Sequence, residues 1–282
     1  MIKIVGALSI SLCFQVQARD YLCFLHGAQG DSEYMLEGVA PKLRNAGVPF
    51  ISFQMNVKDE VQQRAASVAG DFGKLLKTDP SARCHLIGYS MGGLVARYLV
   101  NHSTVIVDGI EEDFRDRVLS LATTSSPHFG TPFAQLLKDN YPGLMPALES
   151  LSEEGVVVFN DPHSEFYSPE PVAIPTMFYS TFVKSKSELV HFETKLGYAY
   201  LEKVLTSRGD DPSNDGLVPA SSMSFGERVE DLRISHYFLS HQVPGRIRAY
   251  DFLLAHWKSV ADPQVENFFQ NFFELGSLME VL

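Results

Sequence analysis

The chain has 282 residues, of which 45% are hydrophobic and 20% charged, so it can bury one large core. Its 34 acidic and 23 basic residues give a formal net charge of -11, which repels phosphate backbones and anionic membrane surfaces. The composition excludes a disordered or low-complexity chain and makes nucleic acid an unexpected partner.

The first eighteen residues have the pattern of a signal peptide. Lys3 precedes an apolar run over 4–14, and Val16-Gln17-Ala18 places small side chains where a signal peptidase needs them. We therefore expect cleavage near Ala18 and export to the periplasm or the medium; the alternative is an ordinary buried strand or helix. No apolar run reaches the roughly 18 to 20 residues of a membrane helix, so we expect a soluble mature protein without a permanent membrane anchor.

Short, uniformly apolar runs at 21–25 and 84–87 are typical of strands buried on both faces of a parallel sheet. Further strands are expected at 48–54, 118–123 and 176–183. Helical spacing of apolar residues predicts the crossovers at 33–46, 61–77 and 94–100. Because strands and helices alternate, the expected fold class is α/β with a mostly parallel sheet, in one domain over residues 19–282.

Residues 131–172 interrupt this alternation and predict an inserted cap over the carboxyl edge of the sheet. The prolines that separate its segments are Pro142, Pro146, Pro162, Pro169 and Pro171. The segments carry helically spaced apolar residues, which are Phe133, Leu136, Leu137, Leu144, Leu148 and Leu151. This apolar face covers either the core permanently or a pocket from which it can move away.

Two cysteines remain after removal of the signal peptide, Cys23 and Cys84. Their even number is compatible with a disulfide in an oxidising compartment. Each lies inside a run expected to be a central strand, so we predict two buried thiols that behave as small hydrophobes and do not pair.

The pentapeptide Gly88-Tyr89-Ser90-Met91-Gly92 has the pattern G-x-S-x-G between an apolar strand and a helix. This placement matters because a tight turn there exposes the serine hydroxyl, and the glycines remove side chains that would collide. Ser90 is the candidate nucleophile; the alternative is a structural turn serine.

A serine nucleophile needs fixed hydrogen-bond donors for the oxyanion. His26-Gly27-Ala28-Gln29-Gly30 follows the first apolar strand, where such a loop supplies one backbone N–H, and the residue after the nucleophile supplies the other. We expect Ala28 and Met91 as donors, with Gln29 as second choice to Ala28. His26 is expected to fix the loop through hydrogen bonds.

Asp215 in Ser213-Asn214-Asp215-Gly216 is the candidate acid because Asp-Gly forms a tight turn. Asp210 and Asp211 are competitors that we interpret as solvated loop charges. Three histidines follow in the order Ser, Asp, His: His236, His241 and His256. Apolar neighbours on a helical stretch favour a surface or packing role for His256.

Together, several segments resemble the bacterial triacylglycerol lipases and lipase-like serine esterases of the α/β-hydrolase superfamily. The segments are His26-Gly27, Gly88 to Tyr98, Ser126-Pro127-His128-Phe129-Gly130-Thr131-Pro132 and Asn214 to Val218. The resemblance implies the α/β-hydrolase fold and Asp215 as the triad acid. It also places the histidine some twenty residues later, which favours His236, 21 positions after Asp215. His241 remains the alternative base.

The sequence departs from that family at two positions. Calcium-binding members carry an aspartate two residues after the catalytic histidine, where this chain has Phe238, so we expect no metal and no other cofactor. Ala28 stands where those lipases often have a larger apolar side chain, which weakens any expectation of long-chain specificity.

The sequence predicts a serine hydrolase that cleaves carboxylic esters, lipid esters in particular, through an acyl-enzyme. The expected partners are a small-molecule or lipid ester and, if the cap moves, a transient lipid interface. The alternatives are an acyltransferase with the same triad, a catalytically silent binding protein of the hydrolase fold and, less favoured, a peptidase.

Overall fold

A computed structural model describes residues 19–28, 36, 38–107, 109–140, 146–169, 174–239 and 249–261. The expected signal peptide, residues 1–18, lies outside these ranges, as do Gln29, Leu144 and His241. Within them, no helix combines the length and apolar character needed to cross a membrane.

A six-stranded sheet forms the centre of the molecule, and every pair of neighbouring strands is parallel. Its order is β2-β1-β3-β6-β7-β8. The strands are β1 (Asp20–Leu25), β2 (Phe50–Phe53), β3 (Arg83–Tyr89), β6 (Val118–Thr124), β7 (Thr176–Phe182) and β8 (Glu227–Arg233). The predicted α/β class with a mostly parallel sheet is confirmed.

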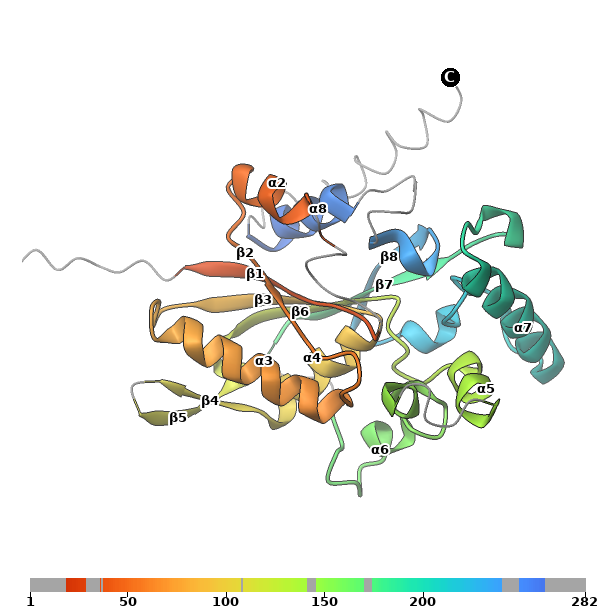
Figure 1. Cartoon of the computed structure of the whole chain (residues 1–282), viewed down its shortest axis with the longest axis horizontal. Coiled ribbons are helices and arrows are strands. Elements are labelled where there is room, and N and C mark those ends of the chain that lie inside the picture. Colours follow the sequence, from red (N-terminus) through yellow and green to blue (C-terminus); the bar gives the residue numbers. More distant parts are fainter. Residues whose placement is uncertain are drawn as a thin grey trace, which may run out of the picture.

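Helices cover both faces of the sheet (Figure 1). Helices α3 (Val61–Leu76) and α4 (Met91–His102) pack on one face, and α2 (Val39–Asn45) and α8 (Ala249–Ala261) lie on the other. Cys23 and Leu25 contact the first layer, whereas Leu22 and Phe24 contact the second. Since successive strand residues point to opposite faces, a strand with a core on both sides must be apolar throughout.

Several elements depart from the sequence expectations. The hairpin of β4 (Thr104–Val107) and β5 (Ile110–Asp113), and the helix α7 (Phe192–Arg208), were not predicted. Strand β8 was missed because it lies at the sheet edge and reads Glu-Arg-Val-Glu-Asp-Leu-Arg, without an apolar run. The helix expected at 33–46 begins at Val39.

The prediction that Cys23 and Cys84 stay unpaired is wrong, because the two form a disulfide with Cα atoms 5.7 Å apart. They lie on adjacent strands, where Cys23 is opposite Leu86 and Cys84 is opposite Tyr21. Both therefore project toward the α3 and α4 layer as diagonal neighbours, within the Cα separation that a disulfide spans. The sequence alone does not reveal that β1 and β3 are neighbours.

The region between β6 and β7 contains α5 (Pro132–Asn140), a 3-10 helix at Pro146–Leu151 and α6 (Val157–Asn160). Phe133 of α5 packs against Leu201 and Leu205 of α7. Leu148 and Leu151 are buried in the core that α3 and α4 share with the sheet. The predicted apolar face is thus occupied by packing contacts in the described part of this region.

Candidate active site

The candidate nucleophile lies in a strained turn between β3 and α4. Ser90 has φ 54° and ψ -126°, and its backbone N–H donates to the Thr124 carbonyl of the adjacent strand at 3.0 Å. The positions two residues before and two residues after Ser90 must be glycine. A Cβ at Gly88 would lie 2.6 Å from the backbone of Gly93. A Cβ at Gly92 would collide with the Leu25 carbonyl. The pentapeptide is therefore shaped by close backbone approach, as its sequence context predicts.

Three side chains from distant parts of the chain meet at the carboxyl ends of the strands. The Ser90 Oγ lies 3.0 Å from His236 Nε2, and His236 Nδ1 lies 2.9 Å from Asp215 Oδ2. Because an ionised carboxylate only accepts, His236 donates from Nδ1 and leaves Nε2 free to accept the Ser90 proton. This arrangement can draw the proton from Ser90 and hold the resulting imidazolium against a buried carboxylate.

Asp215 is held by the sequence around it. Its Oδ1 accepts hydrogen bonds from the backbone N–H groups of Leu217 at 3.1 Å and Val218 at 2.9 Å. Gly216 has φ 103°, a conformation that favours glycine, and its N–H donates to the Asn214 side chain at 2.9 Å. Each residue of Asn-Asp-Gly-Leu-Val thus helps to form the turn that presents the carboxylate.

His236 follows β8 and is fixed at both backbone ends. Its N–H donates to the Asp215 carbonyl at 2.9 Å, and its carbonyl accepts the hydroxyl proton of Tyr89, the residue before the nucleophile. Burial raises the pKa of Tyr89 well above its ordinary value, so the phenol stays a donor. Tyr89 thus joins the turn of Ser90 to the loop of His236.

The loop over 26–28 lies alongside the nucleophile. A Cβ on Gly27 would lie 3.0 Å from the Ser90 Cβ and 3.4 Å from its Oγ. His26 fixes the loop as predicted: Nδ1 donates to the Gly27 carbonyl at 2.8 Å and Nε2 accepts the Met55 N–H at 2.9 Å. Met91 is the first residue of α4, where backbone N–H groups have no partner within the helix. Gly27 therefore lies alongside Ser90, and Met91 follows Ser90 directly at the start of α4.

A buried arginine forms hydrogen bonds to the carbonyls of the same loop. Arg64 of α3 is fully buried and donates to the carbonyls of Gly27 at 3.0 Å and Ala28 at 3.1 Å. It also donates to the carbonyls of Val57 and Asp59. Burial lowers its pKa to about 10, which still leaves it charged at neutral pH. With their carbonyls turned toward Arg64, the loop residues keep a fixed backbone orientation.

The structure places the other candidates away from this site. Asp210 and Asp211 are exposed in the loop after α7. His256 is a fully buried residue of α8, and its Nδ1 lies 3.0 Å from the Tyr179 hydroxyl. His241 lies outside the described residues. The sequence analysis did not single out Tyr89 or Arg64, although a lone arginine on the apolar face of α3 was a visible signal.

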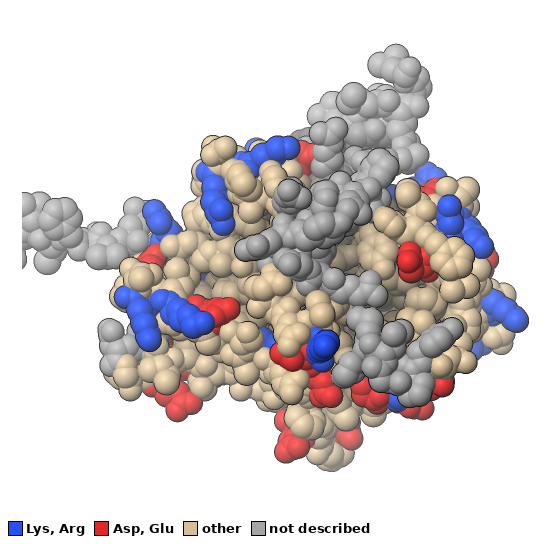
Figure 2. Space-filling view, in the orientation of Figure 1, with Lys and Arg blue, Asp and Glu red and all other residues tan. Residues whose placement is uncertain are grey.

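The described residues contain no group of three or more His, Cys, Asp or Glu side chains placed to hold a metal. Phe238, at the position where an aspartate would support calcium binding, is buried between the rings of Tyr89 and Phe252. The surface in Figure 2 carries acidic and basic side chains interspersed among uncharged ones.

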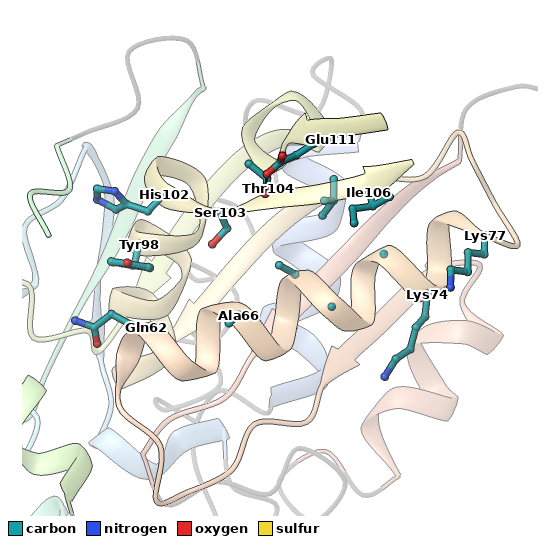
Figure 3. Close-up of a pocket in the computed structure, with 14 residues that line it drawn as sticks. Gln62, Ala66, Lys74, Lys77, Tyr98, His102, Ser103, Thr104, Ile106 and Glu111 are labelled. Carbon is teal, nitrogen blue, oxygen red and sulfur yellow. Dashed lines mark hydrogen bonds between the residues drawn. The ribbon is translucent and has the colours of Figure 1, made fainter. Parts of the chain in front are cut away.

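A separate open groove of about 760 Å³ lies on the outer side of α3. Figure 3 shows that it runs between α3, the end of α4 and the β4-β5 hairpin. Small residues of α3, among them Ala66, Gly70 and Gly73, form its floor, and none of the three site side chains lines it.

No protein-family model and no curated protein matches the sequence. Solved structures do match. Lipase BlEst2 of Bacillus licheniformis, in its mature form, is 16% identical with a TM-score of 0.58, over 78% of this chain and 86% of that one. The metagenomic carboxyl esterase MGS0156 is 15% identical with a TM-score of 0.61, over 90% of this chain and 76% of that one. EstA of Clostridium botulinum is 13% identical with a TM-score of 0.58, over 86% of this chain and 87% of that one.

The chain has the α/β-hydrolase fold. The predicted resemblance to bacterial lipases and esterases is confirmed at the level of the fold. Within this fold, the nucleophile candidate follows β3, the acid candidate lies between β7 and β8, and the histidine follows β8. The chain order Ser, Asp, His is the order of this fold.

Proposed function

We propose that the chain is a serine hydrolase that cleaves carboxylic esters, lipid esters among them, with Ser90, His236 and Asp215 as its catalytic triad. The observation that carries the proposal is the hydrogen-bond sequence from Ser90 Oγ to His236 at 3.0 Å and from His236 to Asp215 at 2.9 Å. The fold shared with proteins described as lipases and esterases supports the ester as substrate.

In the proposed reaction, His236 Nε2 takes the Ser90 proton while Oγ forms a bond to the ester carbonyl carbon. The N–H groups of Ala28 and Met91 receive the oxyanion. The intermediate then expels the alcohol, which takes the proton from His236, and leaves an acyl-Ser90. Water attacks this acyl-enzyme with His236 again as base, and the products are a carboxylic acid and free Ser90.

Alanine substitutions test the triad. Ser90→Ala and His236→Ala are each expected to lower kcat for a soluble p-nitrophenyl ester by a factor on the order of 10³ or more. His241→Ala, the rival base, is expected to retain most of the activity. Circular dichroism should match the parent in all three. Retained turnover in Ser90→Ala contradicts the assignment, and a reversed order of the histidine variants makes His241 the base.

One assay separates the proposal from its rivals. The enzyme is incubated with esters of increasing chain length, emulsified triglyceride and phospholipid, and both released acid and acylated acceptor are measured. Released acid supports a hydrolase, whereas transfer to an alcohol indicates an acyltransferase. A chain that neither turns over esters nor reacts with a fluorophosphonate is a binding protein.

We further propose that residues 1–18 direct export. The Cys23–Cys84 disulfide supports this, since disulfides form and persist in oxidising compartments. Mass spectrometry of the protein from the periplasm or medium tests it: an N-terminus near Arg19 is expected, and a full-length cytoplasmic product contradicts it.

A further inference from the structure

The Asp215 carboxylate has a fourth partner that belongs to neither the triad nor its turn. Thr181 Oγ1 lies 2.8 Å from Asp215 Oδ2, the same oxygen that accepts from His236. Thr181 is on β7 and, like Asp215, is fully buried. The oxygen that orients the histidine is therefore shared with a hydroxyl from the sheet.

The direction of these hydrogen bonds follows from the chemistry of the groups. A carboxylate only accepts, so the single proton of the Thr181 hydroxyl points to Asp215. Ser125 Oγ lies 2.8 Å from Thr181 Oγ1 and must then be the donor to it. Ser125, also fully buried, thus begins a directed chain that runs from Ser125 through Thr181 to Asp215.

Ser125 is held in an unusual backbone conformation. In the described part of the chain, two residues other than glycine have a positive φ. They are Ser125, at 55°, and Ser90, at 54°. A left-handed conformation costs such a residue roughly 1–2 kcal/mol, so surrounding contacts must maintain it. Ser125 directly follows Thr124, the residue whose carbonyl accepts the Ser90 N–H. One turn at the end of β6 therefore contacts both the nucleophile and, through Thr181, the acid.

We propose that Thr181 and Ser125 are positioning residues of the active site. Thr181 fixes the rotation of the Asp215 carboxylate so that Oδ2 faces His236 Nδ1, and Ser125 fixes the hydroxyl of Thr181. The inference rests on the proposed triad but concerns two residues outside it, whose hydroxyls bond to each other and to Asp215. The effect should appear in kcat, because the orientation of His236 matters to proton transfer, while substrate binding is left unchanged.

The test compares variants that differ by single atoms. Thr181→Val replaces the hydroxyl by a methyl group of similar size, and Thr181→Ser keeps the hydroxyl. Thr181→Val is expected to lower kcat by about 10- to 100-fold with little change in KM, and Thr181→Ser to restore most of it. Ser125→Ala is expected to lower kcat less in the parent and to add little in the Thr181→Val background, since both act through one chain.

Thr123→Val is the matched control. It removes another buried threonine hydroxyl, which bonds His128 at 3.2 Å rather than Asp215, and should leave kcat close to the parent value. Melting temperatures are recorded for every variant. Parental kcat in Thr181→Val, or equal losses in Thr181→Val and Thr181→Ser at similar stability, overturns the proposal. If Thr181→Val does not fold, parental kcat in a folded Ser125→Ala overturns it.

A second readout separates this inference from the proposed substrate. The rate at which Ser90 reacts with a fluorophosphonate reports activation of the hydroxyl without any ester. If the parent reacts but cleaves no ester, the ester proposal fails while the slower labelling expected of Thr181→Val still supports positioning. If parent and variant react at the same rate, the positioning role is refuted.

Discussion

Tyr89 is the residue whose role the sequence hides most completely, because it occupies a variable position of the G-x-S-x-G pattern. Its hydroxyl donates to the His236 carbonyl, and its ring lies 5.4 Å from the imidazole between centroids. It thereby couples two segments separated by 147 residues. This buried hydroxyl forms one of the bonds that hold His236 close to Ser90.

Tyr89→Phe removes only that oxygen. We expect kcat to fall by about 3- to 10-fold with KM nearly unchanged, because the loss of one hydrogen bond loosens the histidine without altering a surface that contacts substrate. Steady-state kinetics on a soluble ester measures this, with Tyr98→Phe on α4 as the control tyrosine. Unchanged kcat, or a change confined to KM, would refute the coupling role.

Among the elements, the segment between β6 and β7 bears on whether the expected cap is fixed or can move away from the core. Arg97 of α4 is buried and donates to the carbonyls of Ser168 and Phe159 and to the Asn160 side chain. Ser168 donates back to the Arg97 carbonyl at 2.9 Å. Together with the buried Leu148 and Leu151, these bonds fix residues 146–169 to the nucleophile helix.

A fixed cap predicts simple kinetics. We expect the hydrolysis rate of a short-chain triglyceride to saturate smoothly through its solubility limit, because opening this segment would strip several hydrogen bonds from a buried guanidinium. The rate is measured across that limit in the parent and in Arg97→Met, which releases the bonds. A sharp rise in the parent would mean that another part of the region moves as a lid.

The Cys23–Cys84 disulfide closes a loop of the chain that contains α2, β2 and α3, because the two cysteines are 61 residues apart. In the chain-entropy account, closing such a loop restricts the unfolded state and stabilises the fold by about 4 kcal/mol. Cys23→Ala/Cys84→Ala should therefore unfold at distinctly lower urea concentration, with activity retained because Cys84 lies at the opposite end of β3 from Ser90. Equal stability of variant and parent would show that the bond contributes nothing.

At the scale of the whole molecule, buried histidines make the free energy of unfolding depend on pH. Burial lowers the pKa of His256 to about 3, helped by His85, and burial also lowers the pKa of His85 and His128. An unfolded histidine has a pKa of about 6.5, so below this pH the unfolded chain takes up protons that the folded chain refuses. The free energy of unfolding then falls as the pH falls.

For His256 the expected slope is about 1.4 kcal/mol per pH unit between about pH 6.5 and pH 3. His85 and His128 contribute in the same direction. Burial raises the pKa of Glu230 to about 7 and gives the opposite slope, but this carboxyl is partly exposed and counts for less. The melting temperature as a function of pH measures the combined effect of these groups. His256→Asn should make the melting temperature depend less on pH. A parental melting temperature that is constant from pH 7 to 4.5 would contradict the prediction.

The sequence by itself determined the elements whose signals are local. Uniform apolar runs specified the strands around Cys23 and Cys84, and G-x-S-x-G between strand and helix specified the turn of Ser90, because backbone sterics act between near neighbours. Asn-Asp-Gly-Leu-Val specified the turn of Asp215 for the same reason.

Only the tertiary structure decided what depends on which strands are neighbours. The adjacency of β1 and β3 produced the disulfide, and that of β3, β6 and β7 brought Ser125 and Thr181 to Asp215. Tyr89 reaching the His236 carbonyl belongs to the same class. Such contacts join residues far apart in the chain, and their hydrogen bonds and packing depend on the assembled sheet, so no short stretch of sequence carries their signal.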